Sequence, residues 1–134
     1  MTYRNVQFGF ELTLPSGWTG PGLLKRMLQA SNQPEFFGQS GSSLKVAIGP
    51  ISPVPTIEQQ LANLSAIANR YGHSVIDTGT IQVGKKTHAT VTCHIPQVGV
   101  LKNYSIIFGS TEYFFTGCGA LQQCDMIVQS FEIV

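Results

Sequence analysis

The chain has 134 residues and a mass of 14.5 kDa, a length that predicts a single domain over residues 1–134. Eight Lys and Arg side chains against seven Asp and Glu give a net charge of +1, which provides no long-range field to attract nucleic acid or an anionic membrane surface. Hydrophobic residues make up 43% and charged residues 11%, a composition that excludes disorder and favours uncharged strands and turns.

The first predicted element is a strand over residues 8–14. Its apolar side chains alternate with smaller or polar ones, which is the period of a half-buried strand. These apolar side chains are Phe8, Phe10, Leu12 and Leu14. The turn residues Pro15-Ser16-Gly17 end the strand. Trp18 follows this turn, where its large ring can cover one end of the core or anchor a partner protein.

Residues 19–43 leave two interpretations open. Pro21 can open a short helix, but a strand over residues 23–30 explains the pattern nearly as well. In the helical interpretation the apolar stripe is Leu23, Leu24, Met27 and Leu28. Residues 31–43 are rich in Asn, Pro, Gly and Ser and predict a loop, in which Phe36-Phe37 folds back onto the core.

A second strand over residues 44–48 precedes the clearest helix, over residues 56–71. Thr56 and Gln59 have the spacing of a capping box, and Gly72 stands where a left-handed C-terminal cap is needed. Apolar residues spaced by 4, 3, 4 and 3 predict the buried face. They are Ile57, Leu61, Leu64, Ala68 and Tyr71.

The second half of the chain contains four strand-like stretches. They cover residues 74–83, 86–96, 100–108 and 112–116. The two- or three-residue links between them can join only antiparallel neighbours, so these strands form a meander. A helix over residues 119–130 follows, with Ala120, Cys124, Ile127 and Phe131 on one side, and a short strand over 131–134 ends the chain. The predicted class is α+β, a mostly antiparallel sheet of about six strands with helices packed on its faces.

Both ends of the chain resemble PsbP-like proteins. Phe8-x-Phe10-x-Leu12-x-Leu14-Pro15-x-Gly17-Trp18 is similar to the family's opening aromatic strand and Pro-x-Gly-Trp turn. Tyr113-Phe114-Phe115-Thr116, a helix, and Ile127-Val128-Gln129-Ser130-Phe131 resemble its closing strand, helix and Ser-Phe ending. The order of elements between them matches too, so the resemblance covers about residues 8–18 and 44–134.

The superfamily contains the photosystem II extrinsic subunit PsbP, a Ran-binding nuclear-import factor and small bacterial proteins of unknown role. The resemblance implies an antiparallel sheet with helices on its faces. It also implies a binding or assembly role rather than catalysis. It transfers neither a partner nor site residues.

The constellation with most chemical content is His88, Cys93 and His94. His88 and His94 share one face of a strand but lie about 20 Å apart along it, too far to bind one metal ion. Cys93 points to the opposite face from its neighbour His94, although a pair with His73 stays open. The alternative interpretation is two surface histidines and one core thiol.

Thr90 and Thr92 lie between these histidines and, with Asn103 and Ser105 on the next strand, predict a smooth uncharged face. If no helix covers this face, it suits a ligand or another protein. If a helix covers it, the face is a polar layer at the helix margin. We take Trp18, His88, Thr90, Thr92, His94 and Asn103 as candidate binding residues.

The cysteines are Cys93, Cys118 and Cys124, and this odd number does not suggest a secreted disulfide framework. A bridge between Cys118 and Cys124 remains open beside three reduced thiols. No stretch approaches the roughly 20 apolar residues of a membrane span, and the first twenty residues do not form a signal peptide. We therefore expect a cytoplasmic protein, unless a leader has been removed.

No motif indicates a reaction. The chain has no phosphate-binding loop, dinucleotide fingerprint, nucleophile elbow or zinc-protease helix, and no cofactor is expected. The leading hypothesis is a non-enzymatic module that binds a protein partner or forms a homo-oligomer. The alternatives are a small metal-binding or thiol-dependent enzyme that uses the Cys and His residues, and a small-ligand carrier with an apolar cavity between the sheet and residues 19–43.

Overall fold

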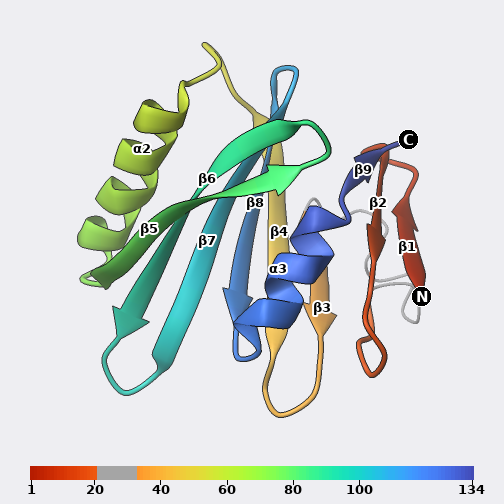
Figure 1. Ribbon diagram of the computed structural model, residues 1–134, viewed down its shortest axis with the longest axis horizontal. Coiled ribbons are helices and arrows are strands. Elements are labelled where there is room, and N and C mark those ends of the chain that lie inside the picture. The colour runs from red at the N-terminus through yellow and green to blue at the C-terminus, as the bar shows by residue number, and fades with distance from the viewer. Residues whose placement is uncertain (21–32) are drawn as a thin grey trace.

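The computed structural model describes residues 1–20 and 33–134, so the alternatives for residues 21–30 lie outside the described residues (Figure 1). Its elements, in chain order, are β1 (Thr2–Asn5), β2 (Phe10–Thr13), β3 (Glu35–Phe37), β4 (Ser43–Pro50), α2 (Ile57–Arg70), β5 (Ser74–Val83), β6 (Lys86–Ile95), β7 (Gly99–Phe108), β8 (Thr111–Cys118), α3 (Leu121–Gln129) and β9 (Glu132–Ile133).

The larger sheet has the order β3-β4-β8-β7-β6-β5, and every neighbouring pair is antiparallel. Strands β5 to β8 lie side by side in chain order, which confirms the predicted meander. Strand β4 extends this sheet by pairing with β8 along all of its length, from Ser43 opposite Cys118 to Pro50 opposite Thr111. The predicted α+β class with a mostly antiparallel sheet is confirmed.

The chain ends form a second sheet, of order β1-β2-β9. Strand β2 lies inside the predicted range 8–14, and β9 lies inside the predicted terminal strand. The strand β1 was not predicted, because its four residues have no buried side chain and pair only with β2. Figure 1 shows this small sheet at the right, with α3 between it and the meander.

The loop predicted over residues 31–43 is wrong at Glu35–Phe37, which form β3 on the edge of the larger sheet. Phe36 is buried, as predicted, but Phe37 is 51% exposed. Both follow from the strand geometry, because neighbouring side chains point to opposite faces. Thr19 and Phe37 exchange two main-chain hydrogen bonds, and this bridge fixes Trp18 beside β3.

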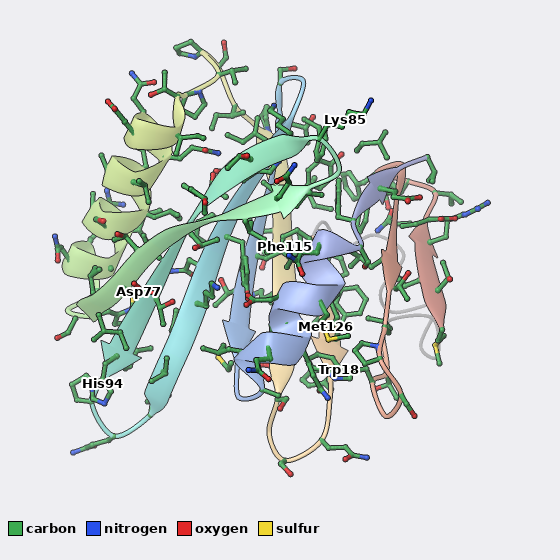
Figure 2. The ribbon with its side chains drawn as sticks, in the orientation of Figure 1. Trp18, Asp77, Lys85, His94, Phe115 and Met126 are labelled. Carbon is green, nitrogen blue, oxygen red and sulfur yellow. The ribbon has the colours of Figure 1, made fainter. Side chains whose placement is uncertain are left out.

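The two faces of the larger sheet carry different cores. The face toward α3 and the small sheet holds most of the aromatic side chains, among them Phe10, Trp18 and Phe115. Figure 2 shows Phe115 behind α3. The opposite face packs against α2 through a smaller cluster of Leu64, Ala68, Ala89, Val91, Cys93 and Leu101. Among the described residues, the sheet is therefore the middle layer between α2 on one face and α3 on the other.

Local signals place α2 correctly, although its buried stripe is shifted. Thr56 and Gln59 form the predicted capping box. Gly72 adopts the predicted left-handed conformation, with a φ of 73°. Leu64 and Ala68 are buried, but Ile57 is 37% and Tyr71 68% exposed. These two predicted core positions are wrong because Ile57 lies in the first turn and Tyr71 caps the C-terminus, beyond the central turns that pack on the sheet.

The last helix is shorter than predicted, since α3 begins at Leu121 and Ala120 is its N-cap residue. Cys124, Ile127 and Phe131 are buried, as the spacing predicted. Within residues 1–20 and 33–134, neither helix has the length and the apolar character needed to cross a bilayer.

Candidate functional site

A pocket of about 390 Å³ opens where three chain segments meet: the turn after β2, the β3–β4 turn, and the start of α3. This volume lies in the range typical of small-molecule pockets. The described residues that line it carry no charge. They are Ser16, Trp18, Gln39, Ser40, Ser42, Gly119, Ala120 and Gln123.

Trp18 forms the floor of this pocket, and three neighbouring groups hold it in place. Its amide donates to Pro15 O across the turn, with Gly17 at φ 87°. Its indole Nε1 donates to Gln123 Oε1 at 2.7 Å. Gly38 packs against the ring, and only 2% of Trp18 is exposed. Figure 2 shows Trp18 near the lower end of α3, where the first helical turn contains Gln123.

The β3–β4 turn forms a second wall. Gly38 N–H donates to Ser42 O, and Ser42 N–H donates to Gln39 O. Ser40 and Gly41 both have positive φ, of 56° and 78°, so the turn closes tightly and leaves the Ser40 side chain exposed.

The start of α3 completes the site. Ala120 offers no side-chain cap, but its amide donates to Ser42 Oγ at 3.0 Å, which joins the β3–β4 turn to the helix. At Gly119, with φ 80°, a β-carbon would come within 2.7 Å of Ser42. Glycine is thus required at this junction for both its conformation and the close approach.

The described lining suits recognition rather than catalysis. Hydroxyl and amide groups can donate and accept hydrogen bonds, but none of them titrates near neutral pH, so the lining provides no general acid or base. Trp18 is almost completely buried beneath these groups and gives the pocket a rigid apolar base.

Of the predicted site residues, only Trp18 lies in this pocket. His88, Thr90, Thr92 and His94 share one face of β6, as predicted, and the structure shows that this face points toward α3. Burial decreases along this face from His88 to His94. His88 is 1% and Thr90 3% exposed, whereas Thr92 is half-buried and His94 is exposed. His88 is therefore not a surface histidine. The part of the face that contains it is a covered layer.

Asn103 and Ser105 lie on the opposite face from Thr90 and Thr92, so the predicted shared polar face is wrong. Asn103 stands opposite Val91, and Ser105 opposite Ala89, on the side of α2. Both are buried and satisfied by neighbours: Thr116 Oγ1 donates to Asn103 Oδ1 at 3.0 Å, and Ser105 Oγ donates to Glu112 Oε2 at 2.7 Å. The buried Gln60 of α2 donates to Ser105 O.

The three cysteines are free thiols, although the Cys124 thiol donates to the main-chain oxygen of Cys118 at 3.9 Å. Cys118 packs with the α2 cluster, whereas Cys124 lies in the core on the other face, which closes the question of a bridge between them. Cys93 on β6 and Cys118 on β8 both stand opposite Leu101 of β7, which lies between them. Two strand spacings put the main chains of the two cysteines about 10 Å apart. Burial raises the pKa of Cys93, and it raises that of Cys124 to about 11.

Metal-ligating side chains do not gather either. Within the part of the chain that the structure describes, no group of three or more His, Cys, Asp or Glu side chains is placed to hold a metal ion.

The other lining residues of the pocket were not singled out in the sequence. Ser16, Ser40 and Gln123 come from segments separated by more than 20 residues, and serine and glutamine in turns are common. The one usable signal was the Pro15-Ser16-Gly17 turn that precedes the single tryptophan of the chain.

No protein-family model matches the chain, and no curated protein does. Solved structures match over its full length. Cyanobacterial PsbP (CyanoP) from Synechocystis sp. PCC 6803 superposes with a TM-score of 0.65 at 14% identity, covering 100% of this chain and 92% of that chain. The Ran-binding protein Mog1p from Saccharomyces cerevisiae gives a TM-score of 0.67 at 11% identity, covering 100% and 95%. The resemblance to PsbP-like proteins is thereby confirmed at the level of the fold.

Proposed function

We propose that this protein is a non-enzymatic binding module that recognises an uncharged segment of a partner protein in the Trp18 pocket. The observation that carries the proposal is the pocket itself, a space of about 390 Å³ in which the described lining is uncharged and Trp18 is fixed by Gln123. Trp18 is 2% exposed and forms the rigid base of the pocket, whereas the exposed residues Ser16, Gln39 and Ser40 supply the groups that a partner can contact. The Ran-binding protein Mog1p, which shares the fold, is itself a binding protein by name.

A protein partner is favoured over nucleic acid or a lipid surface by charge. With a net charge of +1, the chain offers no strong attraction for phosphate groups. Hydroxyl and amide groups around the pocket instead match the main-chain donors and acceptors of an extended peptide.

The enzymatic alternative has less support. Thiol catalysis needs a thiolate, and burial disfavours the charged form of Cys93 and Cys124. The ligand-carrier alternative requires an apolar cavity between the sheet and residues 19–43, and because residues 21–32 of that segment lie outside the described part of the chain, this alternative stays a prediction.

The test is a selection of displayed random peptides on the wild-type protein, followed by titration of the selected peptides. Trp18 is the only tryptophan, so its fluorescence reports directly on the pocket. We expect peptides without charged side chains at the contact positions to bind and to change Trp18 emission. The variant Ser16→Arg, which places a long cation at the rim, should weaken binding at least tenfold.

The matched control is Ser110→Arg, the same substitution at an exposed serine in the β7–β8 turn, which should leave binding unchanged. Peptides that bind both variants equally, or that leave Trp18 emission unchanged, would show that the site lies elsewhere. Self-association is measured in parallel by sedimentation. A dimer dissociated by Ser16→Arg and not by Ser110→Arg would identify a second copy of this chain as the partner.

A further inference from the structure

The main-chain ladder between β6 and β7 ends before the tip of the β5–β6 hairpin. Strand β6 pairs with β7 from Ile95 opposite Gly99 to Ala89 opposite Ser105, and this register goes no further. Strands β5 and β6 stay paired as far as Val83 and Lys86. The end of the hairpin thus leaves β7, and Figure 1 shows it crossing in front of the sheet toward the small sheet.

Where this ladder stops, two side chains of β6 form hydrogen bonds with the main chain of β7. The main-chain N–H of Ile107 donates to His88 Nδ1 at 3.2 Å, and Lys86 Nζ donates to the carbonyl oxygen of the same Ile107 at 2.8 Å. Lys86 Nζ also lies 5.6 Å from the centre of the Phe108 ring. Both polar groups of one β7 residue are therefore held by side chains of β6, which clip the hairpin end to the sheet.

This geometry fixes the protonation of His88. Because Nδ1 accepts a hydrogen bond, the ring proton of the neutral imidazole is on Nε2. Nε2 is buried and makes no hydrogen bond with the described residues. A second proton would put a donor on Nδ1, directly facing the N–H of Ile107. Protonation consequently replaces an attractive contact by the opposition of two donors.

Neighbouring charges do not stabilise the protonated form of His88. The positive charge of Lys86, on the same strand, makes protonation of His88 still less favourable. Opposite His88, β5 contributes Ile81, and β7 contributes Phe108, whose ring centre lies 5.5 Å from that of the imidazole. Burial and the Lys86 charge together lower the pKa of His88 to about 4.

The carboxylates on the other packed elements are engaged elsewhere. On α3, Asp125 accepts hydrogen bonds from Lys102 and Tyr104. On β8, Glu112 accepts from Ser105 on the opposite face of the sheet. Tyr113 of β8, in the core on the His88 side, is a neutral phenol throughout this pH range, and burial raises its pKa further.

We propose that His88 and Lys86 form an acid-sensitive clip, and that protonation of His88 detaches the end of the β5–β6 hairpin from Ile107 while the rest of the sheet remains folded. Detachment uncovers Ile81 and Val83, which are 6% and 1% exposed in the closed form. Acid therefore creates an apolar surface on the α3 side of the sheet. This inference is independent of the Trp18 pocket.

Residue-resolved amide hydrogen exchange between pH 7 and pH 4 tests the clip. Once the clip opens, His88 titrates near its ordinary pKa of about 6.5. After correction for intrinsic rates, protection of the Ile107 amide should fall, relative to pH 7, about 20-fold by pH 5 and about 100-fold by pH 4. Amides in the centre of β7 and β8, such as those of Tyr104 and Phe115, should lose much less protection from exchange.

The decisive variant is His88→Gln, whose amide oxygen can accept from Ile107 but does not titrate over this range. Its Ile107 protection should be independent of pH. His94→Gln is the matched control, because His94 lies exposed near the other end of β6 (Figure 2), and its profile should equal that of the wild type. Wild-type protection that does not change with pH overturns the proposal, as does a loss shared equally by all core amides.

A second measurement keeps the proposal testable if His88→Gln does not fold. The ring nitrogen resonances of the wild-type protein report both the position of the ring proton and its titration. We expect His88 with its proton on Nε2 at pH 7 and a titration midpoint well below the ordinary histidine value of about 6.5. A proton on Nδ1, or a midpoint near 6.5 for His88, contradicts the clip.

Discussion

Gly38 lies against the indole of Trp18 so closely that a β-carbon at position 38 would come within 2.5 Å of Cε2 and 2.8 Å of Nε1. The ring cannot retreat, because its Nε1 is bonded to Gln123 and the residue is almost completely buried. Gly38→Ala should therefore lower the free energy of unfolding by about 1–3 kcal/mol, the usual cost of overpacking. Urea unfolding followed by Trp18 fluorescence measures this loss.

Gly49→Ala is the matched control for this substitution. Gly49 has no strained backbone angle, and a β-carbon there meets nothing within 4 Å. The same added methyl group should change stability by less than about 0.5 kcal/mol. Equal effects at the two glycines would mean that the contact between Gly38 and Trp18 is not tight in solution.

A second prediction concerns the acceptor of the indole. Gln123→Leu keeps the approximate size of the side chain but leaves the buried Nε1–H without a partner, which costs about 1–3 kcal/mol. Trp18 emission should change as well. Gln122→Leu, at the exposed neighbouring position of α3, is the control and should leave both observables near wild type. An unaltered stability for Gln123→Leu would show that water satisfies the indole.

Elements controlled by local sequence were predictable. The capping box of Thr56 and Gln59 and the glycine at 72 act within a few residues, so α2 was found with nearly correct ends. Short links force antiparallel neighbours, so the meander was found as well. The edge strands β1 and β3 were missed, because three or four residues carry little pattern and their pairing depends on distant partners.

The faces of β7 show where sequence periodicity fails. This strand is buried on both sides, with Tyr104 and Ile106 in one core and Leu101 in the other. Without an alternation of apolar and polar residues, nothing in the sequence assigns Asn103 to a face. The register of the β6–β7 hairpin decides it, and this register placed Asn103 opposite Val91.

The pocket and the clip depend on contacts between residues that are distant in the sequence. Trp18 and Gln123 are 105 residues apart, and Ser42 and Ala120 are 78 apart. His88 appeared to be a surface residue because it alternates with apolar residues on β6. The curl of the β5–β6 hairpin buries it instead, and no sequence pattern encodes that curl.

A third prediction concerns alkaline pH. Tyr104 OH donates to Asp125 Oδ1 at 2.6 Å, and Lys102 Nζ donates to the same oxygen at 2.9 Å. Burial, together with Asp125, raises the pKa of Tyr104, so the folded protein holds this proton more tightly than the unfolded chain. Above pH 10 the unfolded chain releases the proton, and the stability contributed by Tyr104 is lost as the pH rises.

The measurement is urea unfolding of wild type and Tyr104→Phe between pH 8 and pH 11. Wild-type stability should decline above pH 10 more steeply than that of the variant, which should be about 1–3 kcal/mol less stable at pH 8. Tyr71→Phe, at a tyrosine that is 68% exposed, controls for the loss of a phenol and should follow the wild-type profile. If the unfolding free energies of wild type and Tyr104→Phe changed equally with pH, the raised pKa of Tyr104 would be contradicted.

The thiols give a final prediction, which bears directly on the enzymatic alternative. Cys118 is half-buried, whereas Cys93 and Cys124 are buried and their pKa values are raised. With a pKa of about 11, Cys124 has a thiolate fraction of about 0.0003 at pH 7.5. In the native protein, an aromatic disulfide reagent should therefore modify Cys118 first, and the other two thiols only at the rate at which the protein unfolds.

Cys118→Ser should remove the early phase and leave two thiols that react together after addition of urea. Mild oxidation should yield no intramolecular bridge, because Cys118 and Cys124 lie on opposite faces of the sheet and Cys93 lies two strands from Cys118. Rapid modification of Cys93 or Cys124 in the folded protein would reveal an accessible thiolate. Such a result would reverse the ranking of a binding module over a thiol-dependent enzyme, since reactivity of that kind requires a site that stabilises the charged sulfur.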